Sequence, residues 1–289
     1  MSTPEEQEKL VNQFVEQFPD IVEEADYDEL WGNQLDPKGS YYKESIAKKL
    51  ATKFLRANRW DLELAKEQLK NTLIWRKEFN PLSAGFREKH DEKFDVLGVI
   101  TYHSEQTVPN IKLINWNLYG NVKEPRTIFE DLPTFMRWRV GLMEQALQML
   151  NFEDDTNEYM VQIHDYKNVA FLKLDPSVKK GSKSVIEIFT SYYPEVMSRK
   201  YFVNVPLILS WVYTLVKTFV PKETSRKFQV LSNSKDVGSS LGDLVPTDYG
   251  GKGKKLEDQR FNFNKTGREA VLSDYAAYLL QKQFTEELD

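Results

Sequence analysis

The chain has 289 residues, enough to bury a full core, and its 40% hydrophobic and 29% charged residues are typical of a globular protein. It contains no cysteine, which excludes disulfides, zinc–thiolate sites and thiol catalysis. No window of about 18 residues is continuously apolar, and no basic segment precedes an apolar core at the N-terminus, so neither a transmembrane span nor a secretory signal is expected.

The net charge of −5 is unevenly distributed along the chain. Residues 1–30 carry ten acidic side chains and one basic side chain, Lys9, which leaves +4 for the rest of the chain. A basic body suits contact with anionic lipid head groups, and ordinary solvated lysines are the alternative. No basic–aromatic stripe or nucleic-acid motif is present, so nucleic-acid binding is not expected.

The first part of the chain predicts helices. Residues 1–40 read as an acidic extension with short helices near 5–18 and 26–31. The segment Asn58-Arg59-Trp60 separates a helix that begins near Tyr41 from one that Asp61 can cap and that ends near Phe79. Residues 41–90 are therefore predicted to form a small helical domain. Apolar residues recur along one face of the first of these helices at Ile46, Leu50, Phe54 and Leu55.

From residue 91 the pattern alternates between the periods of strands and helices. This alternation predicts an α/β domain over residues 91–289, with a mostly parallel sheet and a C-terminal helix. Strands are expected at 96–101, 111–116, 159–165, 201–205 and 228–231, and helices at 128–150, 185–192, 207–219 and 271–284.

The chain carries no recognisable catalytic motif. It has no G-x-S-x-G, Walker loop, G-x-G-x-x-G or H-E-x-x-H sequence. Its three histidines, His90, His103 and His164, do not pair at metal-ligand spacing. A binding protein is therefore expected rather than an enzyme.

Two groups of short motifs resemble the CRAL-TRIO family, the Sec-fourteen-like lipid-transfer proteins. Their order and spacing hold across roughly 210 residues, which makes chance an unsatisfactory explanation. The first group is Phe54-Leu55-Arg56-Ala57, Trp60-Asp61, Ala65 and Trp75-Arg76-Lys77. The second is Tyr193-Pro194-Glu195, Val203-Asn204-Val205-Pro206, Lys227 and Leu244 to Gly251.

The resemblance implies a small helical domain followed by an α/β domain whose apolar pocket is closed by a mobile gate helix, here 207–219. In members that bind phosphatidylinositol, the positions of Glu195 and Lys227 contact the head group, and Arg59 fits a helping basic position. A phosphodiester favours a fixed cation and a polyol favours a carboxylate acceptor. The alternative is that Glu195 and Lys227 form a structural ion pair.

The strand before the pocket departs from the family pattern at His164 and Tyr166, which flank the family aspartate Asp165. Alternate residues of a strand share a face, so His164 and Tyr166 are predicted to point the same way. This pair resembles the fungal branch of the family that binds haem in the lipid pocket. The resemblance implies that Tyr166 is the axial ligand of ferric haem b and His164 its companion. It also places Tyr119, Arg139 and Lys200 in the pocket wall, where the two cations can pair with haem propionates.

The resemblance therefore implies a non-classical phosphatidylinositol transfer protein that also binds haem, linked to phosphoinositide homeostasis and oxidant stress. It implies a cytoplasmic protein that associates peripherally with the endoplasmic reticulum or other internal membranes. The alternatives are a lipid or sterol transfer module without haem, and a haem enzyme of peroxidase type. For the His–Tyr pair alone, satisfied polar residues of the core are the alternative.

Overall fold

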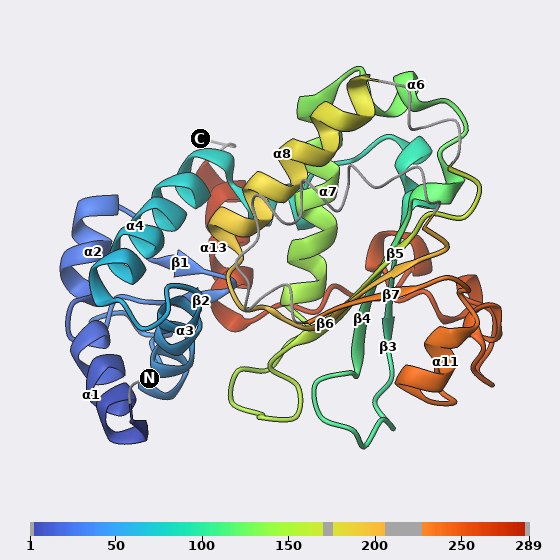
Figure 1. Ribbon diagram of the computed structural model, residues 1–289. Helices are drawn as coiled ribbons and strands as arrows, with labels where there is room; N and C mark the ends of the chain where they lie inside the picture. Colours follow the sequence, from blue (N-terminus) through green and yellow to red (C-terminus); the bar gives the residue numbers. More distant parts are fainter. Residues whose placement is uncertain (1–2, 170–175, 206–226, 287–289) are drawn as a thin grey trace.

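The computed structural model describes residues 3–169, 176–205 and 227–286. An N-terminal group of helices lies against one end of an α/β unit, which confirms the expected fold class (Figure 1). The predicted gate helix at 207–219 lies outside the described residues.

The N-terminal helices pack around a shared apolar core. The first 40 residues belong to this core, since the side chains of Phe14 and Phe18 are buried in the same cluster as Leu50 and Phe54. Asp61 caps its helix as predicted, because its carboxylate accepts a hydrogen bond from the Leu64 backbone N–H at 3.0 Å. The helices are α1 (Pro4–Val15), α2 (Phe18–Ala25), α3 (Glu44–Ala57), α4 (Leu62–Phe79) and α5 (Pro81–Phe86).

The prediction of a short helix near 26–31 is wrong. The structure has a small hairpin there, formed by β1 (Glu29–Leu30) and β2 (Asn33–Gln34). Its two-residue loop, Trp31 and Gly32, has φ values of 51° and 83°. A turn with two positive φ values joins antiparallel strands tightly, and glycine is suited to its second position. Tryptophan is unusual at the first position, so only Gly32 carries the usual sequence signal of this turn.

Within the described residues, five strands form one sheet in the order β3-β4-β5-β6-β7. The first strand is antiparallel to its neighbour and the other pairs are parallel, as a mostly parallel sheet requires. The strands are β3 (Gly98–Tyr102), β4 (Leu113–Leu118), β5 (Met160–Asp165), β6 (Met197–Val203) and β7 (Phe228–Leu231).

Helices cover both faces of this sheet (Figure 1). One face packs against α7 (Leu132–Leu147) and α8 (Pro176–Tyr192), and the other against α11 (Asp236–Leu241) and the segment around Tyr249. The single helix predicted over 128–150 is divided into α6 (Pro125–Phe129) and α7, because Asp131 caps a new helix start. The chain continues through α12 (Phe263–Thr266) to the C-terminal helix α13 (Asp274–Glu286). Short 3₁₀ segments lie at Glu92–Leu97, Tyr119–Asn121, Thr247–Tyr249 and Glu257–Gln259.

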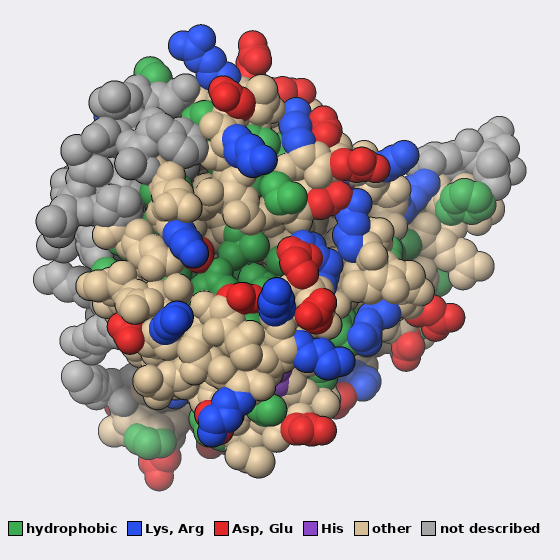
Figure 2. Space-filling model, turned by 90° about the vertical axis from the view of Figure 1, so that its right-hand side faces the viewer, with side chains coloured by type: hydrophobic (Ala, Val, Ile, Leu, Met, Phe, Trp, Pro, Cys, Tyr) green, Lys and Arg blue, Asp and Glu red, His purple; other side chains and the backbone are tan. Residues whose placement is uncertain are grey.

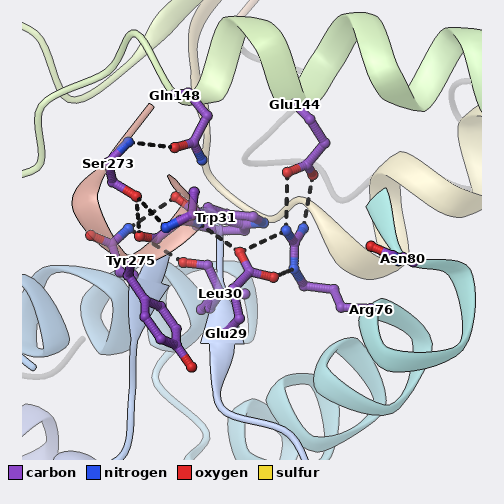
Figure 3. A network of polar contacts seen from close by, with 12 residues as sticks. Glu29, Leu30, Trp31, Arg76, Asn80, Glu144, Gln148, Ser273 and Tyr275 are labelled. Atoms are coloured by element: carbon purple, nitrogen blue, oxygen red, sulfur yellow. Dashed lines mark hydrogen bonds and ion pairs between the residues drawn. The ribbon is translucent and has the colours of Figure 1, made fainter. Parts of the chain in front are cut away.

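A fully buried ion network joins the N-terminal helices to the α/β unit (Figure 3). Arg76 on α4 donates from Nε to Glu29 on β1 at 2.9 Å and from Nη1 to Glu144 on α7 at 2.8 Å. The Tyr193 hydroxyl donates to the same Glu144 carboxylate at 2.6 Å. Burial raises the pKa of Glu29, and the Arg76 guanidinium opposes that shift. Arg76 of the family motif is therefore the cation that fixes the two parts together.

Candidate functional site

A cavity of about 670 Å³ opens between α4, α8 and the face of the sheet that packs against α7. None of the described helices is long and apolar enough to cross a membrane. The cavity is thus the main candidate in the described part of the chain for holding an apolar molecule. Its wall includes Arg139, Gln162, His164, Glu195, Lys200 and Phe228.

The sheet presents two polar rows to α7 and the cavity. In the first row, Asn115, Gln162 and Lys200 are direct partners across β4, β5 and β6. In the second row, Asn117 pairs with His164 in the same way. Residues paired across strands lie on the same face of a sheet, so these rows place amide, imidazole and ammonium groups where apolar side chains normally lie.

Arg139 on α7 is buried beside these rows without a counter-ion among the described residues. Its side chain is 1% exposed, and none of its three guanidinium nitrogens has a hydrogen bond of normal geometry. The Phe189 ring lies 4.5 Å from the guanidinium carbon. Burial lowers the pKa of Arg139, and the nearby Tyr119 hydroxyl opposes that shift without forming a full hydrogen bond. A buried, unpaired guanidinium calls for an anionic ligand.

His164 and Lys200 complete this electrostatic environment. His164 is 4% exposed and its Nε2 atom has no hydrogen-bond partner in the described chain. Burial, with the charges of Lys200 and Arg139, holds the pKa of His164 well below its usual range, so the imidazole is neutral. Burial and Arg139 also lower the pKa of the half-buried Lys200 to about 7. At neutral pH the site therefore holds the Arg139 cation, an amine at Lys200 that is only partly protonated, and a neutral imidazole.

His164 and Tyr166 lie on one side of the sheet, as the alternation of the strand predicts. The Tyr119 ring is 5.7 Å from the His164 ring and 5.5 Å from the Tyr166 ring. Asp165 points the other way and accepts a hydrogen bond from the Tyr249 hydroxyl at 2.7 Å. Tyr119 and Tyr166 adjoin His164 but are not among the described residues that line the cavity. In the described chain, no group of three His, Asp or Glu side chains could hold a metal ion.

Lys227 meets Glu195, a residue of the cavity wall, at the rim of the cavity, although Lys227 itself is not among the described lining residues. The Lys227 ammonium donates to the Glu195 carboxylate at 2.7 Å and to the Met197 carbonyl at 3.0 Å. Glu195 has a φ of 53°, an uncommon conformation for a residue other than glycine. The ion pair that sequence analysis raised as an alternative is thus present, and a head group would have to compete with it for Lys227.

Arg59 is placed differently from the other predicted head-group residues. It is exposed, with a φ of 56°, in the turn between α3 and α4. Its neighbours Ala57 and Asn58 line the cavity, whereas Arg59 is not among the described lining residues. The structure therefore joins Glu195 to Lys227 and leaves Arg59 outside this contact.

Sequence analysis missed one charged residue at this site, Lys53 on α3. Its side chain is 1% exposed and its ammonium donates to the carbonyls of Glu158 and Glu195, each at 3.1 Å. The same ammonium lies 3.5 Å from the centre of the Tyr159 ring, and burial lowers the pKa of Lys53 to about 7. The sequence contains a signal that Lys53 is buried. Lys53 follows Leu50 by three residues and therefore falls on the apolar face of its helix.

The side of the molecule that carries α11 shows no large area of one charge. In Figure 2, lysine and arginine side chains alternate with acidic ones over the coloured part of this face, around an apolar hollow. Several of these charges form exposed pairs, such as Lys252 with Asp243 at 2.7 Å. On this face, solvated surface lysines describe the molecule better than a continuous basic patch.

This fold and cavity define the CRAL/TRIO class of domain. Residues 10–71 match the CRAL/TRIO N-terminal domain and residues 108–251 match the CRAL/TRIO domain. The chain belongs to the CRAL/TRIO family.

Individual relatives match over nearly the whole chain. Phosphatidylinositol transfer protein SFH5 of Kluyveromyces lactis is 42% identical over 98% of this chain and 92% of that protein. The protein of the same name from Saccharomyces cerevisiae strain S288c is 39% identical over 94% of each chain. A crystal structure of Sfh5 superposes with a TM-score of 0.89 and 37% identity, covering 99% of this chain and 100% of that one.

Proposed function

We propose that this protein carries phosphatidylinositol between membranes and performs no chemistry on it. The observation that carries the proposal is the joint placement of Glu195 and Lys227 at the rim of a cavity of about 670 Å³. The names of the similar proteins in yeasts support it. The acyl chains would occupy the cavity, and contact with membranes would be transient, from the cytoplasm to the surface of the endoplasmic reticulum or other internal membranes.

The two rim residues suit the two parts of an inositol phosphate. The Lys227 ammonium can neutralise a phosphodiester, and the Glu195 carboxylate can accept hydrogen bonds from inositol hydroxyls. In the structure the Lys227 ammonium and the Glu195 carboxylate lie 2.7 Å apart, so a head group would have to separate this ion pair in order to bind both residues. Replacement of one ion pair by two ligand contacts keeps both charges satisfied.

Transfer of labelled phosphatidylinositol between vesicles tests this proposal. We expect Lys227→Ala to lower the transfer rate about tenfold, since a charged hydrogen bond to the phosphate is lost. Lys252→Ala is the matched control, because that exposed lysine pairs with Asp243 away from the cavity. Absence of transfer by the unaltered protein, or full activity of Lys227→Ala, would contradict the proposal.

We further propose that the same cavity binds ferric haem b. The observation that favours it is the buried, unpaired guanidinium of Arg139 beside the unpaired Nε2 of His164. Tyr166 adjoins His164 without lining the described cavity, and it would hold the iron through its phenolate if haem reached that side of His164. Arg139 and Lys200, which line the cavity, would neutralise the propionates. The neutral imidazole of His164, next to Tyr166, would hold a hydrogen bond at the iron-binding phenol. Bound haem would supply a redox-active iron, which suits a role in the response to oxidants.

A visible spectrum of the purified protein, before and after addition of ferric haem, tests this second proposal. We expect a Soret band that Tyr166→Phe shifts or abolishes. Tyr102→Phe, in β3 against Phe261, is the matched control and should leave the band unchanged. A protein that stays colourless with added haem, or a Tyr166→Phe spectrum identical to that of the unaltered protein, would contradict the proposal.

A further inference from the structure

Consecutive residues of the segment that precedes Glu195 contact the N-terminal helices. Gln68 on α4 donates from its amide to the carbonyls of Thr190 and Ser191 at 3.3 and 3.0 Å. Two turns further along α4, the Trp75 ring stacks on Tyr192 with centroids 4.4 Å apart and planes 7° apart. The end of α8 is thus bound to α4 by both polar and aromatic contacts.

The next residue is held from the opposite side. The ring of Tyr193 is fully inside the core, stacked at 11° on Trp31 with centroids 6.4 Å apart. Its hydroxyl donates to Glu144 at 2.6 Å, within the Arg76 network. Pro194 follows and is also buried. The chain therefore reaches Glu195 in a fixed position and direction.

Lys53 supplies the last of these contacts, at Glu195 itself. The φ of 53° at Glu195 is strained for a residue with a side chain, so this conformation persists only if neighbours hold it. Lys53 binds the Glu195 carbonyl at 3.1 Å, and Lys227 binds its carboxylate at 2.7 Å. These contacts are independent. When a head group takes Lys227, the hold of Lys53 on the backbone remains.

We propose that Lys53 is a positioning residue for the head-group site, and that the N-terminal helices thereby set the selectivity for inositol. This inference rests on the proposed transfer of phosphatidylinositol. The Lys53 side chain is 1% exposed, against 25% for Lys227, and its ammonium binds the carbonyls of Glu158 and Glu195, so Lys53 acts through Glu195 rather than on the lipid. By fixing the left-handed backbone at Glu195, it aims the carboxylate that would accept the inositol hydroxyls. A lipid without inositol has no hydroxyl groups to donate to that carboxylate, so its binding should not depend on how the carboxylate is oriented.

The experiment compares transfer of phosphatidylinositol with transfer of phosphatidylcholine of the same acyl chains by three variants. Lys53→Met keeps the length and removes the donor, Lys53→Arg restores a buried donor, and Lys49→Met removes an exposed lysine one turn earlier on α3. We expect Lys53→Met to lower phosphatidylinositol transfer about tenfold relative to phosphatidylcholine, because a charged hydrogen bond that orients the site is lost. Lys53→Arg should recover most of the ratio, and Lys49→Met should leave it unchanged.

Other outcomes would overturn the inference in distinguishable ways. A loss of both lipids together in Lys53→Met would show that Lys53 only stabilises the fold. Unchanged selectivity in Lys53→Met, or a folded Lys53→Arg that fails to restore it, would remove the positioning role and leave the proposed transfer intact. If the unaltered protein transfers no phosphatidylinositol, the proposed function itself fails, and the inference with it.

Discussion

Replacement of Arg76 by methionine tests the reasoning about the buried ion network. Methionine has a similar length but no charge, so the variant leaves Glu29 and Glu144 together without a cation. Both carboxylates are 0% exposed, and no solvent can replace the guanidinium. Removal of one partner from a buried ion pair typically costs about 3–5 kcal/mol. That is a large share of the roughly 5–15 kcal/mol that stabilises a folded domain.

The loss should depend on pH with a definite sign. Burial already raises the pKa of Glu29, and without Arg76 the largest opposing contribution is lost, which leaves the hydrogen bond from the Gly32 backbone N–H to counter that rise. A carboxylate whose pKa is higher in the folded than in the unfolded chain favours folding at low pH, and its contribution is lost as the pH rises through the folded pKa. The defect of Arg76→Met should therefore shrink as the pH falls from about 7.5 to about 5.5, by up to about 1.4 kcal/mol per pH unit for each such group.

Urea unfolding at these two pH values, followed by tryptophan fluorescence, measures the effect. A double variant, Arg76→Met with Glu144→Gln, removes one of the two stranded charges and should recover part of the stability at the higher pH. A loss below about 1 kcal/mol, or an equal loss at both pH values, would refute the account of a network held by one cation between two carboxylates.

Three further predictions concern packing, a buried hydrogen bond and a buried amine. Gly141→Ala should lower the free energy of unfolding by about 1–3 kcal/mol, because a Cβ there would lie 2.3 Å from the Ala84 carbonyl oxygen. Thermal unfolding measures this loss, and an unchanged melting temperature would contradict the close approach of α5 and α7. Tyr249→Phe should cost about 1–3 kcal/mol in urea, since Asp165 loses a buried donor, and a smaller effect would mean that water replaces it. The pKa of Lys53, about 7 when folded, lies below its usual value, so the unfolded chain binds more protons and stability should rise from about pH 7 to 9. In Lys53→Met this rise should be flatter, and equal slopes would show that other groups cause it.

Much of the architecture followed from periodicity and motif spacing. The helices on either side of Asp61 and the strands around Ile163 depend on local patterns, and the structure has both. The observed helix boundaries differ from the predicted ones where a capping residue starts a new helix. Asp131 is such a residue, and it divides one expected helix into two. The hairpin at Trp31 was missed because its turn uses tryptophan at a position that usually takes asparagine or glycine.

The site was predictable only in part. The pairing of Glu195 with Lys227 and the shared face of His164 and Tyr166 follow from motif order and strand alternation. The role of Lys53 depends on a carbonyl 142 residues further along the chain, which no local pattern contains. The exposed position of Arg59 was likewise invisible, because the motif fixes its place in a turn and not the direction of its side chain.

The polar rows on the sheet have a consequence for how proteins with this fold can diversify. Along β5, Gln162 and His164 face the cavity, whereas Val161 and Ile163 pack in the core on the opposite side. Substitutions on the cavity side therefore leave the other half of each strand untouched. A few exchanges on that side could retune the interior from polar to apolar, and so from one cargo to another, while the same scaffold continues to fold.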